Sequence, residues 1–159
     1  MNGSHGTQET HGTQETHVSA DSIARSCAVG AATTMGLLAV FQAALAAGVP
    51  WGEAAFGGAS AELSAPFRIS AGVAVLIWSG AALVVLRRAG HPVWAPLPRR
   101  ALPVAVWVIA SYAATGIVVN AISPSVLERS IWVPVTAAMS ALTFAVAIAK
   151  RRPRSARAS

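Results

Sequence analysis

The sequence predicts an all-α protein, a bundle of four membrane-spanning helices with a polar N-terminal tail. Four long apolar runs make up most of the 159-residue chain, and a helix of about 20 residues is enough to cross the hydrocarbon core of a bilayer. Apolar residues account for 54% of the chain and charged residues for 11%, whereas soluble domains carry roughly 25% charged residues. The basic residues flank the apolar runs, where they act as topology signals.

Residues 1–25 form a polar segment without a hydrophobic period, so we expect a disordered cytoplasmic tail. The hexapeptide HGTQET occurs twice in this segment, and His17 begins a third copy that does not continue. Histidines spaced by six residues can be offered as metal ligands, but an unstructured tail has no geometry to hold them. We therefore predict neither a metal nor a cofactor for this chain.

Residues 26–150 form the predicted membrane domain, and residues 151–159 a basic cytoplasmic tail. A signal peptide competes with the first span because Ala44-Leu45-Ala46 resembles a cleavage site. The apolar run is longer than a usual signal-peptide core, which favours a retained span. Ser125 and Glu128 form a capping-box pattern before the fourth apolar run, in which Pro134 stands either in the first turn or at a kink. The spans are expected at about 27–48, 69–86, 101–122 and 131–149.

Basic residues are distributed unevenly between the two sides of the predicted bundle. If the four spans alternate, one side carries Arg25, Arg87, Arg88, Arg99, Arg100 and the cluster from Lys150 to Arg157, and the other only Arg68 and Arg129. The positive-inside rule then places both termini in the cytoplasm. A single lysine among many arginines, with abundant alanine, indicates a bacterium with a GC-rich genome. The expected location is therefore the bacterial plasma membrane.

The segment from Val49 to Phe67 is the longer of the two predicted outer connections. We expect one or two helical turns at the membrane interface, ending at Gly57-Gly58. The segment is too apolar to extend freely into water, so it should fold back over the bundle and bring Glu53 or Glu62 to Arg68 or Arg129. Trp51, Trp94 and Trp132 are expected in the aromatic belt at the membrane surface. The candidate polar cluster on this outer face is Glu53, Glu62, Arg68, Asn120, Glu128 and Arg129.

Three classes of function are compatible with these residues, and none assigns a catalytic residue. A transporter or channel-like oligomer without proton coupling is one alternative, because Gln42 and Asn120 can line a polar path while the spans lack ionisable side chains. An outer-face membrane enzyme using Glu53 and Arg68 is another. An accessory or interaction protein is favoured, because its rivals lack the residues they need. The expected partners are the lipid bilayer and either another membrane protein or a second copy of the chain. Nucleic acid is not expected, because the basic residues are not interleaved with aromatic ones.

Several short segments resemble those of uncharacterised short four-span integral membrane proteins from high-GC bacteria. They are Pro50-Trp51-Gly52-Glu53 with Phe56-Gly57-Gly58, Leu86-Arg87-Arg88-Ala89-Gly90, Asn120 with Ser123, and Glu128-Arg129 followed by Trp132 and Pro134. The resemblance covers the four spans and not the N-terminal tail. It implies a shared fold, and it brings no activity.

Overall fold

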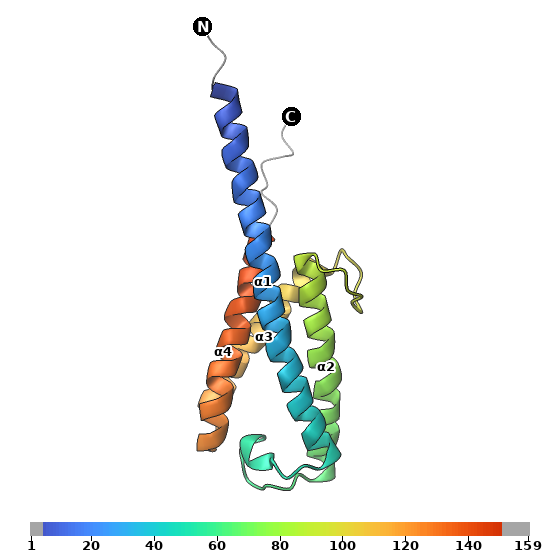
Figure 1. Cartoon of the computed structure of the whole chain (residues 1–159). Coiled ribbons are helices and arrows are strands. Elements are labelled where there is room, and N and C mark those ends of the chain that lie inside the picture. Colours follow the sequence, from blue (N-terminus) through green and yellow to red (C-terminus); the bar gives the residue numbers. More distant parts are fainter. Residues whose placement is uncertain (1–4, 151–159) are drawn as a thin grey trace.

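Four long α-helices and one short 3-10 helix make up the computed structural model of the chain (Figure 1). The structure describes residues 5–150, with side chains described from Ala20 onward. In chain order the elements are α1 (His5–Ala47), η1 (Gly52–Ala54), α2 (Ala65–Ala89), α3 (Leu102–Ala121) and α4 (Val126–Ala149). The all-α, four-helix prediction is therefore confirmed.

Each of the four α-helices is long and apolar enough to cross a membrane. The candidate spans are Ala20–Ala47, Ala65–Ala89, Leu102–Ala121 and Val126–Ala149. Large apolar side chains face outward along them, and Leu76 and Ile122 are each 75% exposed. A surface of this kind is unfavourable in water and suits lipid. The chain is thus a multi-pass integral membrane protein with four candidate spans.

Helix α1 is much longer than the first predicted span. It begins at His5, runs through the HGTQET repeat, and extends well beyond the other helices (Figure 1). The expected boundary between tail and membrane domain, near residue 26, therefore lies inside a continuous helix. The predicted disorder of the tail stays a prediction, and the basic tail at 151–159 lies outside the described residues.

The helix ends follow from local sequence signals. Pro66 stands in the first turn of α2, and Gly90 ends that helix in the left-handed region with φ 96°. Ser125 caps α4 by accepting a hydrogen bond from the Glu128 amide at 3.2 Å, which confirms one half of the predicted capping box. Pro134 lies inside α4, beyond its first turn, so the carbonyl of Ser130 lacks its usual helical donor.

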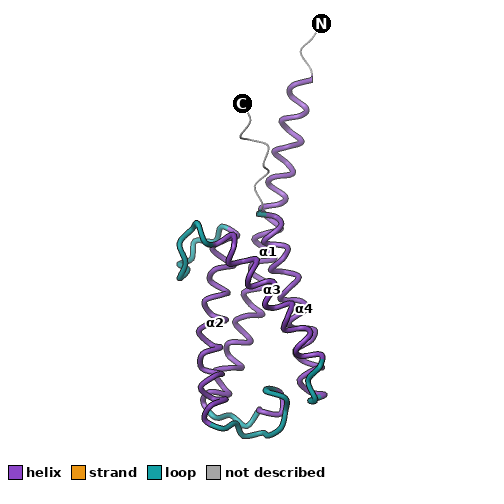
Figure 2. Tube along the Cα trace, turned by 180° about the vertical axis from the view of Figure 1, so that it is seen from behind, coloured by secondary structure: helices purple, strands orange, loops and turns teal. Residues whose placement is uncertain are grey.

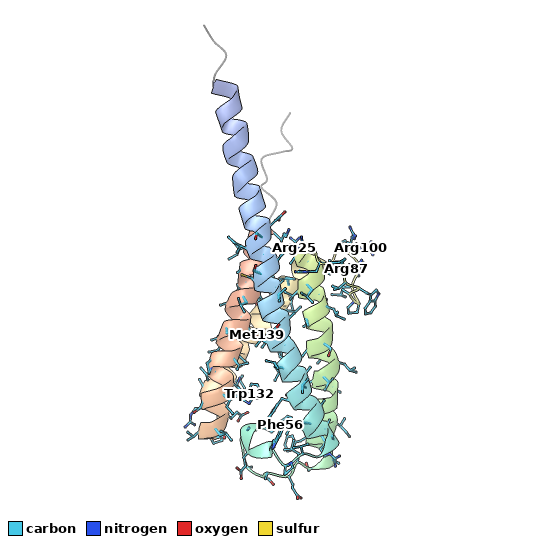
Figure 3. All side chains as sticks on the ribbon, viewed as in Figure 1. Arg25, Phe56, Arg87, Arg100, Trp132 and Met139 are labelled. Carbon is cyan, nitrogen blue, oxygen red and sulfur yellow. The ribbon has the colours of Figure 1, made fainter. Side chains whose placement is uncertain are left out.

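The helices pack as two antiparallel pairs. Helix α1 packs on α2, α3 packs on α4, and α1 and α4 join the pairs, whereas α2 and α3 meet less closely. The main buried core draws on all four helices, with Met139 in the middle of the bundle (Figure 3), and a smaller cluster around Leu45 lies near residues 48–64. The largest fully buried side chains of the main core include Met35, Val85, Val106, Met139 and Val146, each 0% exposed.

The two ends of the bundle differ in charge. Arg25, Arg87 and Arg100 lie at the end from which α1 projects (Figure 3), and we call this the arginine end. Lys150 pairs there with Asp21, with Nζ 2.5 Å from Oδ1, and so joins the C-terminus of α4 to α1. The opposite end, which we call the loop end, holds residues 48–64 and the turn between α3 and α4.

Candidate functional site

Residues 48–64, which we call the cap loop, fold back across the loop end of the bundle. Figures 1 and 2 show this segment leaving α1, passing beneath the helices toward the start of α4, and returning to α2. Its only regular element is η1, so the expected helical turns are reduced to three residues. The two arms of the loop cross at Gly52, whose amide donates to the Ala61 carbonyl at 2.8 Å.

Hydrogen bonds to the start of α4 fix the cap loop. The Glu128 carboxylate accepts the amide of Gly57 at 3.0 Å on Oε2, and the same oxygen accepts the hydroxyl of Ser123. The Ser125 hydroxyl donates to the carbonyl of Glu53 at 2.8 Å. Each such bond to a neutral group typically contributes about 0.5–1.5 kcal/mol, and a bond to a charged group roughly 1.5–3 kcal/mol. The loop is therefore held mainly by α4.

Trp132 is the third anchor of the cap loop. Its indole nitrogen donates to the Ala54 carbonyl at 2.6 Å, and the centroid of its ring lies 4.8 Å from the centroid of the Phe41 ring. The sequence placed Trp132 in the aromatic belt, and this is wrong because the residue faces inward and supplies a donor to an otherwise unpaired loop carbonyl. Trp51 and Trp94, at opposite ends, are 52% and 70% exposed and are positioned for the belt.

The expected ion pairs of the cap loop do not form. Within the described chain, Glu53 and Glu62 make no ion pair with Arg68 or Arg129, and both carboxylates are exposed. Instead, Arg68 donates to the Ala46 carbonyl at 3.1 Å, and Arg129 donates to the Ser123 carbonyl. Arg68 thus satisfies a carbonyl left open in the last turn of α1, and Arg129 satisfies a carbonyl in the turn between α3 and α4.

A cavity of about 620 Å³ lies beneath the cap loop, between the two helix pairs. Its volume falls within the roughly 300–1,000 Å³ typical of small-molecule sites. All four helices and the cap loop contribute to its wall, which is mostly apolar. Toward the middle of the bundle, the ring centroids of Trp78 and Tyr112 lie 5.8 Å apart, so these side chains pack α2 against α3. Five aromatic side chains line the cavity: Phe41, Phe56, Trp78, Tyr112 and Trp132.

A few polar groups converge on this apolar space. The Oε1 atom of Gln42 is buried without a hydrogen-bond partner among the described residues. Asn120, from α3, also lines the cavity, so both amides that the sequence proposed for a polar path lie in its wall. Glu128 is 9% exposed and contributes the one charge among the lining residues of the described chain. An unpartnered buried oxygen is costly unless a ligand or water satisfies it.

The candidate cluster from the sequence is thus divided by the structure. Glu128 and Asn120 line the cavity, whereas Arg68 and Arg129 donate to backbone carbonyls and Glu53 and Glu62 face outward. Sequence reasoning missed the contributions of Ser123, Thr136 and the aromatic side chains, since a ring in an apolar run gives no sign of which way it faces.

A second hollow lies at the arginine end, along the connection between α2 and α3. It is lined by Arg87, Arg88, His91, Trp94 and Arg99, among others. The imidazole of His91 lies 3.3 Å from the carbonyl of Arg25, which ties this connection to α1. The concentration of positive charge and the exposed Trp94 suit the headgroup region of a membrane carrying anionic lipids.

No family model matches this sequence, and neither a curated protein nor a solved structure is significantly similar to it. The resemblance to short four-span membrane proteins therefore identifies no family.

Proposed function

We propose that this protein is an accessory membrane protein that binds an amphipathic small molecule or lipid in the cavity beneath the cap loop. The observation that carries the proposal is a site-sized, mostly apolar cavity whose wall also holds the polar side chains of Asn120 and Glu128. Ligand pockets are commonly apolar spaces with a few well-placed polar groups, and this cavity has that composition. An amphipathic molecule would place its chain against the rings and its polar head near Asn120 and Glu128.

The packing at the arginine end favours a binding pocket over a continuous channel. Val85, Val106 and Val146 fill that half of the bundle with no exposed surface. The enzyme alternative based on Glu53 and Arg68 has no support, because neither residue lines the cavity and the two make no ion pair.

Filling the cavity should abolish binding. Ala74 lines it from α2, one turn before Trp78 and on the same face, so Ala74→Phe places a ring in the space a ligand would occupy. Ala138→Phe makes the same change at an exposed site on α4 that does not line the cavity. Dodecanol and dodecyltrimethylammonium, both tritiated, serve as amphiphilic probes in equilibrium dialysis with the protein in maltoside micelles, corrected for partitioning into empty micelles.

We expect at least one probe to bind the natural chain saturably. Its affinity should be unchanged in Ala138→Phe. In Ala74→Phe the affinity should fall about tenfold or more, a change of at least 1.4 kcal/mol in binding free energy. Saturable binding of neither probe would overturn the proposed function. Equal binding by the two phenylalanine variants would do the same.

We further propose that the protein lies in a bacterial plasma membrane with both termini in the cytoplasm and the cap loop outside. The imbalance of arginine and lysine between the two ends supports this orientation. In a Cys27→Ser background, a membrane-impermeant maleimide should label Ser60→Cys, in the exposed part of the cap loop, in intact cells. Ser155→Cys should react only after lysis. Labelling of Ser155→Cys and not Ser60→Cys in intact cells would reverse the orientation.

A further inference from the structure

The charge of the residues that line the cavity indicates the charge of the ligand, which the shape of the cavity alone does not. Glu128 supplies the one charge among the lining residues of the described chain, and five aromatic side chains line the same cavity. Within the described part of the chain, no lysine, arginine or histidine lines the cavity. A ligand in this space therefore meets a negative carboxylate and the negative faces of aromatic rings, both of which attract a cation.

Glu128 also retains capacity for a ligand. Both hydrogen bonds that its carboxylate accepts, from Gly57 and Ser123, go to Oε2. The other oxygen, Oε1, accepts none within the described chain, and no arginine or lysine there lies within ion-pair distance of the carboxylate. Arg129, its neighbour in sequence, is directed instead to the Ser123 carbonyl. The carboxylate is 9% exposed and has no cationic partner within the described chain, so its negative charge is available to a cation in the cavity.

We propose that the cavity is a site for an amphipathic cation, an alkylammonium or amine, whose charged head lies at Glu128 and whose chain lies among the aromatic rings. The inference rests on the proposed function and adds the charge of the ligand to it. The Oε1 atom of Glu128 can accept a hydrogen bond from a primary or secondary ammonium, and Trp132 and Trp78 supply aromatic rings in the wall for a quaternary one. The same ammonium chemistry occurs in free amphiphiles and in lipid headgroups.

The test compares two probes of equal chain length, dodecyltrimethylammonium and dodecanol, on the full chain in maltoside micelles. Glu128→Gln removes the charge but keeps an oxygen that can accept from Gly57 and Ser123, so the cap loop should stay in place. We expect this variant to lose at least tenfold in affinity for the cation and to keep its affinity for dodecanol. Glu53→Gln, which removes the same charge from an exposed position at the same end, should change neither affinity.

The other outcomes separate the two proposals. If Glu128→Gln weakens both probes equally, or weakens neither, the charge preference is overturned while the cavity remains a binding site. If Ala74→Phe fails to weaken either probe, the proposed function itself fails. Competition by lysophosphatidylcholine, which carries the same ammonium group on a lipid, would identify a headgroup as the source of the cation. Competition by simple alkylammonium ions alone would identify a free amphiphile.

Discussion

Gly52→Ala is expected to open the cap loop and to produce the largest loss of stability of any single methyl addition at the loop end. A Cβ atom at this position would lie 2.3 Å from the Ser60 carbonyl oxygen, 2.8 Å from that of Ala61 and 2.8 Å from a methyl group of Leu63. Two of these neighbours are backbone atoms, and the Ala61 oxygen accepts the Gly52 amide. Neither arm of the loop can move aside without breaking the crossing, so the cost should reach or exceed the roughly 1–3 kcal/mol of ordinary overpacking.

The measurement is the thermal midpoint of the purified protein in maltoside, together with the reaction rate of a cysteine placed at Ala55, which is buried against the bundle. In the Gly52→Ala protein the midpoint should fall and the thiol should react much faster. Gly36→Ala is the matched control, because a Cβ there meets nothing within 4 Å. In the middle of α1 that change should be neutral, or stabilising by up to about 1 kcal/mol. Equal stability of the two variants would show that the loop does not cross itself at Gly52.

The four-helix fold could be predicted from the sequence because its signals are local. Apolar runs of spanning length, arginines at their ends and the Ser125–Glu128 pattern each report on a segment without reference to the rest of the chain. The observed α4 begins at Val126, directly after the predicted cap at Ser125. The predicted span over 101–122 agrees with α3, whereas α2 and α4 begin four and five residues before the predicted spans and α1 begins at His5. Hydrophobicity marks only the apolar part of a helix, so the predicted first span began near residue 27.

The site could be predicted only in part, because it depends on which faces of the helices meet. The pairing of Glu53 or Glu62 with Arg68 or Arg129 was inferred from charge alone, and it neglected the open carbonyls at the end of α1 and in the turn between α3 and α4. Arg68 donates to the carbonyl of Ala46, and Arg129 donates to the carbonyl of Ser123, six residues before it in the chain. A backbone carbonyl of this kind needs a hydrogen-bond donor. The sequence did place Asn120 and Glu128 among the candidates, but that they line one cavity with Gln42 depends on how α1, α3 and α4 pack.

Glu128→Ala should release the cap loop in a different way from Gly52→Ala, by removing an acceptor rather than adding a clash. The alanine variant leaves the Gly57 amide and the Ser123 hydroxyl without the carboxylate oxygen they share. The start of α4 itself should persist, because Ser125 still caps the amide of residue 128. Loss of two bonds to a charged group, at roughly 1.5–3 kcal/mol each and partly offset by water, gives an expected cost of about 2–4 kcal/mol for the closed loop.

Hydrogen exchange at the amides of residues 52–58 measures this cost directly, since exchange of a locally opened segment reports the free energy of opening. We expect exchange to accelerate about 30- to 1,000-fold in Glu128→Ala, following the factor of ten per 1.4 kcal/mol. Glu128→Gln, which retains an acceptor oxygen, should accelerate exchange far less than Glu128→Ala. Glu62→Ala should leave the exchange rate unchanged, because that exposed carboxylate accepts no hydrogen bond in the described chain. If Glu128→Ala does not accelerate exchange, the carboxylate does not hold the loop. Glu128 would then face the cavity for its charge alone, and ligand binding should respond to Glu128→Gln without any change in the loop.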